Sequence, residues 1–225
     1  MSAAGPRFTD IHRLLDERRE LSSLGRALQL LVGIPIMAVV LHALVAGFLE
    51  DGVDQLARTT QAELLWIADR NPYAADRTRQ WMDSSHDWLF RRSGIEPLVM
   101  NGQNPVGKQF ARVAIPAYQG IVASVQLLAL RLSTLVTAMP LIGVLIVVAV
   151  VEGMSNWYLR RQNGARESSF LYHRFKKAVK LALPALLVVC LVPPVPVDPV
   201  WVFLPFFSII VAGLAASLSF FKKHI

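Results

Sequence analysis

The segment EGMSNWYLRRQNGARESSFLYHRFKKAVK, residues 152–180, decides how the rest of the chain is arranged. It contains seven Lys and Arg residues against two Glu residues, and long apolar runs flank it on both sides. Lys and Arg near the ends of membrane spans resist translocation, so a basic loop between two spans is normally held in the cytoplasm. We therefore predict that this segment is a cytoplasmic loop. Its position determines on which side of the membrane the other segments lie.

The composition indicates a membrane protein that crosses the bilayer several times. The chain is 54% hydrophobic and 17% charged, with a mean hydropathy of +0.44, whereas soluble domains carry roughly 25% charged residues. The charges are missing from whole stretches, as in membrane spans. The net charge of +7 does not by itself indicate nucleic-acid binding, because positive cytoplasmic loops alone raise the pI of a membrane protein.

The apolar runs predict an all-α integral membrane protein with four transmembrane helices and both termini in the cytoplasm. A span needs about 20 apolar residues, and the third run is near the lower limit. For the N-terminal segment, an amphipathic helix on the membrane surface and a solvated tail are equal alternatives. In chain order the predicted segments are a cytoplasmic amphipathic N-terminal segment (1–26), the first span (27–49), a periplasmic helical segment (50–131), the second span (132–152), the basic cytoplasmic loop (153–180), the third span (181–197), a Pro-rich periplasmic turn (198–200), the fourth span (201–221) and a cytoplasmic tail (222–225).

The periplasmic segment predicts a helical hairpin. Apolar residues recur at helical spacing over residues 53–67. Asn71 followed by Pro72 ends one helix and starts the next, and Gly94 can cap the second helix. Trp81 and Trp88 either pack the hairpin or lie at the membrane interface.

Two ionisable residues interrupt the apolar runs. Arg131 divides residues 113–151, and we expect its side chain to snorkel at the outer end of the second span. His42 is the only ionisable residue inside the first predicted span, and such residues are functional candidates by default. We expect a neutral histidine bonded to a neighbouring helix, because the spans hold no second titratable group for a proton relay.

The basic loop resembles a known family. The segment RRQNGARESSFLYHR, residues 160–174, leads into a Pro-rich turn and the last span. This order resembles the membrane proteins of integrating conjugative elements, a domain-of-unknown-function family found in conjugative transfer gene clusters. The resemblance implies a role in conjugative DNA transfer in a bacterial inner membrane, near the coupling ATPase and the type IV secretion channel. It implies no catalytic residue.

We predict a non-enzymatic, multi-pass component of the inner (cytoplasmic) membrane that acts as a scaffold or as a partner of the coupling ATPase or secretion channel. Topology setting is the alternative explanation for the charge of the loop. Homo-oligomerisation is left open. The candidate contacts for a protein partner or for membrane lipids are Arg160, Arg161, Gly164, Arg166, Glu167, Ser168, Tyr172, His173, Arg174, Lys176 and Lys177.

The alternative function is a small membrane-embedded transporter or enzyme with a site near His42, which would need polar groups converging at membrane depth. The chain has no phosphate-binding GK[ST] loop and no metal-ligand spacing among its His and Cys residues. We therefore predict no catalytic residue, metal or cofactor. Direct DNA binding by the loop is disfavoured, because its aromatic residues fall at membrane ends and anionic lipids compete for its charges.

Overall fold

The computed structural model describes residues 8–100, 105–163 and 169–220, and within these ranges the chain is helical and contains no strand. Seven α-helices and one π-helical turn follow one another along the chain. Their bounds are α1 (Phe8–Phe48), α2 (Gly52–Arg70), α3 (Pro72–His86), η1 (Asp87–Arg91), α4 (Ile95–Met100), α5 (Pro105–Gln162), α6 (Ser169–Leu191) and α7 (Pro199–Ser219).

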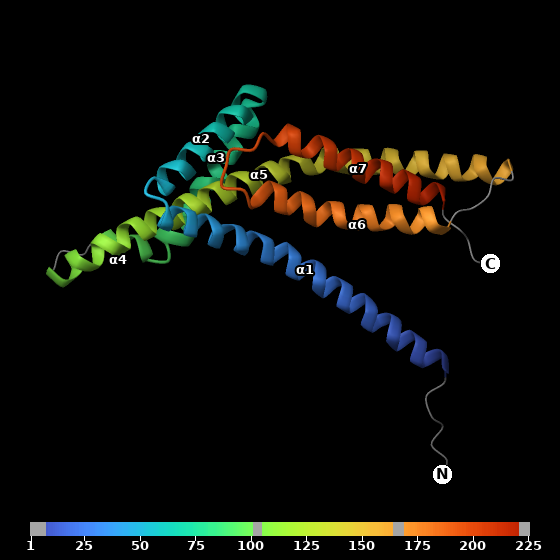
Figure 1. Ribbon diagram of the computed structural model, residues 1–225, viewed down its shortest axis with the longest axis horizontal. Helices are drawn as coiled ribbons and strands as arrows, with labels where there is room; N and C mark the ends of the chain where they lie inside the picture. The colour runs from blue at the N-terminus through green and yellow to red at the C-terminus, as the bar shows by residue number, and fades with distance from the viewer. Residues whose placement is uncertain (1–7, 101–104, 164–168, 221–225) are drawn as a thin grey trace, which may run out of the picture.

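Helix α5 is the axis of the molecule. Its 58 residues make a rod of about 87 Å at 1.5 Å per residue, nearly three times the roughly 30 Å thickness of a hydrocarbon core. The hairpin of α2 and α3 packs on its first half, and α6 and α7 run beside its second half (Figure 1). The sequence predicted that residues before Arg131 lie outside the second span, and one continuous helix joins these two parts.

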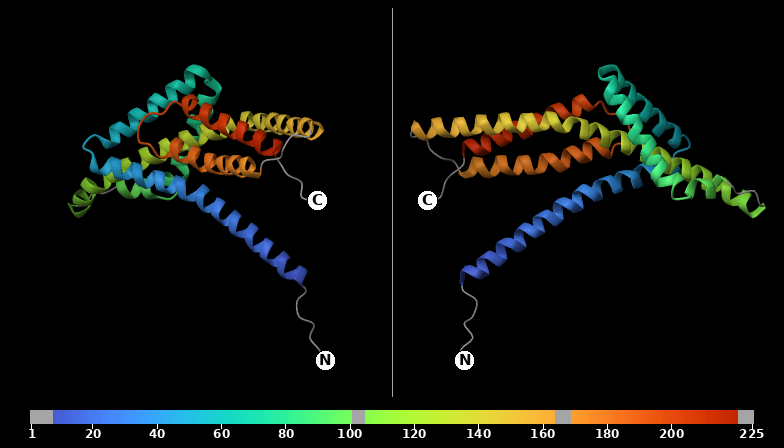
Figure 2. Two further views of the ribbon diagram at one scale, coloured as in Figure 1. Left: turned by 45° about the vertical axis from the view of Figure 1, so that its right-hand side comes forward. Right: turned by 180° about the vertical axis from the view of Figure 1, so that it is seen from behind.

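Helix α1 is likewise continuous over 41 residues. The predicted N-terminal segment 1–26 and the first span therefore share one helix from Phe8 onward. No proline separates them that could end the helix. Ile34 and Ala38 are buried against Leu135 of α5 and Leu191 of α6. From there toward its N-terminus α1 diverges from the other helices (Figures 1 and 2).

The predicted hairpin is present. The Asn71 side chain accepts a hydrogen bond from the backbone N–H of Ala74 at 3.1 Å, and Pro72 occupies the first turn of α3. Gly94 has a φ of 77°, a left-handed conformation that suits glycine at the end of a helix. Trp81 and Trp88 are exposed, so they do not pack the hairpin.

Among the residues that the structure describes, three helical segments are long and apolar enough to cross a membrane: Leu28–Phe48, Ala114–Gln162 and Pro199–Ser219. Three of the four predicted spans therefore coincide with such helices. The third predicted span does not, because its helix ends at Leu191 instead of 197 and its first half is charged. Its uncharged residues 181–191 cover about 16 Å, roughly half of a hydrocarbon core.

Glycines bring α5, α6 and α7 close together. A Cβ added to Gly153 of α5 would lie 2.7 Å from the backbone oxygen of Ala215 in α7. A Cβ added to Gly213 of α7 would lie 2.8 Å from a methyl group of Val179 in α6. Small residues allow membrane helices to approach closely and gain dispersion contacts. These three helices therefore form one packed unit, from which α1 diverges.

Candidate functional site

The most buried charged site in the described part of the chain joins Arg131 of α5 to Glu63 of α2. The Arg131 guanidinium donates to both carboxylate oxygens of Glu63, with its shortest contact at 2.6 Å, and both side chains are 2% exposed. A buried ion pair is stable only when its remaining donors and acceptors are also satisfied. The backbone around the pair meets this condition.

The remaining donors of Arg131 reach the segment that connects α6 to α7. Arg131 Nη1 donates to the carbonyls of Leu191 and Pro193, and Nη2 donates to that of Val195. The backbone N–H of Val197 in turn donates to Glu63 at 3.0 Å. The pair therefore holds α2, α5 and the end of α6 together.

The expectation that Arg131 snorkels at the membrane surface is wrong. Its side chain is buried, because the hairpin folds back over α5 and brings a carboxylate to it. Leu191 is the last residue of α6, and its carbonyl has no partner within the helix. Arg131 thus also serves as a cap for that helix end.

A second ion pair joins the same two regions closer to the surface. Nη1 and Nη2 of Arg70, at the end of α2, each donate to one oxygen of the Asp198 carboxylate at 2.7 Å. Asp198 also caps α7, accepting from the N–H of Val200 at 3.0 Å. The hydrogen bond from Arg70 is the main cause of a lowered pKa at Asp198.

His42 is fully buried, and its Nε2 donates to the Val192 carbonyl at 3.1 Å. This agrees with the expectation of a histidine bonded to a neighbouring element. Its Nδ1 has no hydrogen-bond partner within the described ranges. Glu152 lies far from this point, 21 residues or about 32 Å along α5 from Arg131. His42 and Arg131 do meet at the α6–α7 connection, where they bond to the neighbouring carbonyls of residues 191, 192 and 193, but Glu152 does not join them.

The space beside the buried pair is too small for a substrate. The cavity lined by Glu63, Arg131, Thr134 and Cys190 has a volume of about 10 Å³. One water molecule needs roughly 10–15 Å³ by this measure. The arrangement therefore suits structural support better than chemistry at this point.

Sequence reasoning missed the role of Glu63, although a signal was present. Glu63 is on the same helical face as Leu56 and Thr60, and all three are buried. Leu56 packs against Ala123 and Leu127 of α5. Glu63 is an acidic residue on the apolar face of a helix, and Arg131 is a single arginine within a long apolar run. Together these two features indicate a buried ion pair between them.

The opposite end of the molecule carries the predicted contact residues. We call residues 157–162 of α5 and 170–177 of α6 the basic end. Arg131 and Arg160 are 29 residues apart on α5, or about 44 Å, so the basic end is far from the hairpin (Figure 1). One of these segments is the C-terminal end of α5, and the other is near the N-terminal end of α6, the next helix in the chain.

Cations at the basic end lie over aromatic rings. The Arg160 guanidinium is 4.0 Å from the ring centre of Phe220, and Arg174 is 4.7 Å from that of Phe170. The rings of Tyr172 and His173 meet edge to face. Exposed side chains include Arg161, His173, Arg174, Lys176 and Lys177. The predicted contacts Gly164, Arg166, Glu167 and Ser168 lie outside the described residues.

Comparison with known proteins supplies the context for this arrangement. A family model described as IncC plasmid conjugative DNA transfer protein DtrJ-like matches residues 50–222. The chain belongs to this DtrJ-like family. The match includes the hairpin, the Arg131–Glu63 pair, the basic loop and α7. No curated protein and no solved structure matches the chain.

Membership of the DtrJ-like family confirms the predicted connection with conjugative DNA transfer. The family description names an IncC plasmid, whereas the sequence resemblance pointed to integrating elements. Together with the three apolar helices, this makes the chain a conjugative transfer protein with helices suited to a membrane.

Proposed function

We propose that this DtrJ-like protein is a non-enzymatic scaffold in the bacterial inner membrane, whose basic end contacts the coupling ATPase or the secretion channel of the conjugative machinery. The observation that carries the proposal is the separation of the hairpin from the basic end. Arg131, near the middle of α5, is fixed by buried polar contacts to the hairpin, whereas the basic end presents exposed cations.

The contacts of the two ends differ in kind. The hairpin end contains bidentate and buried pairs, which give a single defined geometry. At the basic end, Arg161, Arg174, Lys176 and Lys177 make no ion pair with an acid in the described ranges. Unpaired cations on a rigid support are suited to an acidic partner surface.

A four-span arrangement with both termini in the cytoplasm fits this proposal. Helix α6 runs beside α5 and α7 in every view (Figures 1 and 2). Its 23 residues make about 35 Å at 1.5 Å per residue, enough to cross with its charged first turns in the headgroup region. The hairpin and the α6–α7 connection then share the periplasmic side, and the basic end faces the cytoplasm.

The experiment is a transfer assay that separates partner contact from topology. Gly164, Glu167, Ser168, Tyr172 and His173 are replaced together by alanine, which keeps every Lys and Arg of the loop. If the loop contacts a partner, conjugation frequency falls at least tenfold while the membrane level of the protein is unchanged. Photocrosslinkers at residues 161 and 173 should then capture the partner chain from conjugating cells.

A Tyr73→Ala variant is the control, because Tyr73 is equally aromatic, 88% exposed and located in the hairpin. It should transfer normally. Normal transfer by the five-residue loop variant would mean that the loop only sets topology. Loss of transfer without any crosslinked chain, but with altered lipid retention, would assign the loop to lipid.

A further inference from the structure

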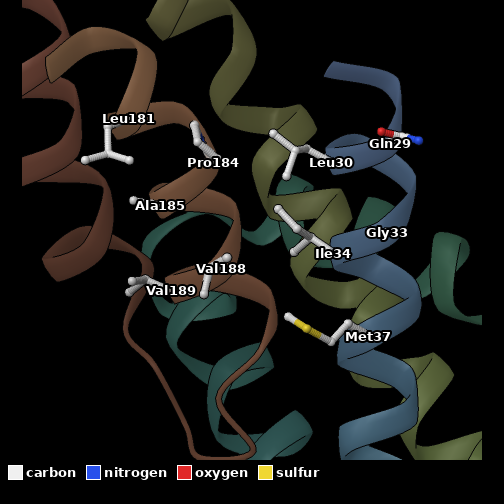
Figure 3. A pocket seen from close by; sticks show the side chains of 10 residues that line it. All are labelled: Gln29, Leu30, Gly33, Ile34, Met37, Leu181, Pro184, Ala185, Val188 and Val189. Carbon is white, nitrogen blue, oxygen red and sulfur yellow. The ribbon is translucent and has the colours of Figure 1, made fainter. Parts of the chain in front are cut away.

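An apolar groove of about 580 Å³ lies between α1 and α6. Its α1 wall contains Leu30, Gly33 and Met37, and its α6 wall contains Pro184 and Val188, with their side chains facing the same space (Figure 3). The divergence of α1 leaves this space open. Gly33 has no atom near the position of a Cβ, so nothing in the described chain fills the groove there.

The α6 wall of the groove continues into cations. Arg174 and Lys177 precede Leu181 and Pro184 by seven residues each, which places them on the same helical face. Both side chains are exposed. Figure 3 shows Leu181 and Gln29 at one end of the groove. Arg174 and Lys177 precede Leu181 in the same helix, so along α6 they lie beyond that end.

The length of the groove matches one leaflet of a bilayer. Along α6 its lining runs from Leu181 to Val189, which is about 12 Å at 1.5 Å per residue. One leaflet of hydrocarbon is roughly 15 Å thick. A partner transmembrane helix would need contact over a longer distance, since a span takes about 20 residues.

We propose that this groove binds one anionic phospholipid of the leaflet on the side of the basic end. Its acyl chain lies on Gly33, Met37, Pro184 and Val188, and its phosphate is held by Arg174 and Lys177. The apolar wall and the cations at one end complement the two parts of such a lipid. Basic pockets between helices at a cytoplasmic face bind anionic headgroups by the same principle.

The test is native mass spectrometry of the full chain in detergent, with phosphatidylglycerol and phosphatidylcholine as competing probes. Wild type should retain one phosphatidylglycerol in preference to phosphatidylcholine. The variant Arg174→Gln/Lys177→Gln should bind phosphatidylglycerol roughly 30-fold more weakly, because each cation near a membrane surface contributes about 1 kcal/mol. Arg161→Gln/Lys176→Gln removes the same charge from the end of α5 and from another face of α6, and should bind as wild type does.

A second pair of variants tests the apolar wall. Gly33→Leu should displace the lipid while leaving both cations in place. Gly143→Leu adds the same side chain to an equally open position on α5, outside the groove, and should not affect binding.

Two results would overturn the proposal. One is equal phosphatidylglycerol retention by wild type, Gly33→Leu and the Arg174/Lys177 variant. The other is a lipid-free dimer that Gly33→Leu dissociates, which would assign the groove to a second copy of the chain.

Discussion

Arg131 and Glu63 are separated by 68 residues in sequence, and their side chains meet at 2.6 Å with only 2% of each exposed. Burying two charges costs several kcal/mol for each ion, and their attraction offsets this only when further hydrogen bonds are made. Here those bonds come from the carbonyls of residues 191, 193 and 195 and the N–H of Val197. The pair therefore makes the position of the hairpin depend on the α6–α7 connection.

We expect Glu63→Gln and Arg131→Gln each to destabilise the protein by about 3–5 kcal/mol, because each leaves an uncompensated buried charge. Arg131→Gln should cost more, since it also removes donors to three backbone carbonyls. The double variant should be less damaging than the sum by about 0.5–3 kcal/mol. Denaturation in detergent measures all three, with Arg58→Gln as the control, because the exposed Arg58 side chain donates to the Asp54 carbonyl of its own helix. Strict additivity would show that the two residues are not coupled.

The Arg70–Asp198 pair predicts a dependence of stability on pH. The pKa of Asp198 is lowered in the folded protein, mainly by the hydrogen bond from Arg70. Its contribution is therefore present above the ordinary Asp pKa of about 3.9 and is lost as the pH falls through the lower folded value.

The measurement compares thermal unfolding of wild type and Asp198→Asn between about pH 6 and pH 3. Asn keeps the helix cap but removes the charge, so the variant should lose less stability on acidification than wild type. Asp76→Asn, which breaks a pair within one helix, serves as the comparison. Parallel pH profiles for wild type and Asp198→Asn would contradict a role for this pair.

His42 should act as a structural donor to Val192. His42→Gln retains a donor and should support normal transfer and folding, whereas His42→Leu should destabilise the protein by about 1–3 kcal/mol by leaving the partly buried Val192 carbonyl without this donor. Melting temperature and conjugation frequency are measured together. A His42→Gln protein that is stable but inactive in transfer would instead favour a functional site near His42.

Gly153 should be intolerant of any side chain. Gly153→Ala places a methyl group against the backbone of Ala215 and is expected to cost about 1–3 kcal/mol. Gly143→Ala, at an open position of the same helix, should be neutral or stabilise by up to about 1 kcal/mol. Thermal melting of the two variants provides the check, and similar losses in both would mean that α5 and α7 do not pack closely at Gly153.

Single cysteines in a Cys190→Ser background test the orientation. Tyr73→Cys and Val195→Cys should react with a membrane-impermeant maleimide in intact spheroplasts, because the hairpin and the α6–α7 connection are joined by Arg131 and Glu63. Arg161→Cys should react only after lysis. Labelling of residues 73 and 195 from opposite sides would contradict both the four-span arrangement and the packing of this region.

Local patterns in the sequence were enough to predict three of the four spans and the hairpin. Apolar runs located three membrane-competent helices, since transfer into hydrocarbon depends mainly on the composition of one segment. Asn71 and Pro72 located the turn of the hairpin, because capping and proline geometry involve adjacent residues. The resemblance carried by the basic loop gave the conjugative context, which the family match confirms.

The tertiary structure decided which charges are buried and how far each helix runs. Sequence spacing could not place Glu63 beside Arg131, because their contact requires α2 to fold back along α5. Pro193 and Pro194 mark the end of α6 in the sequence, but the fold alone supplies Arg131 as the partner of the Leu191 carbonyl. Hydrophobicity is a property of each segment and can be read along the chain, whereas the energy of a buried charge depends on partners that only the folded chain brings together.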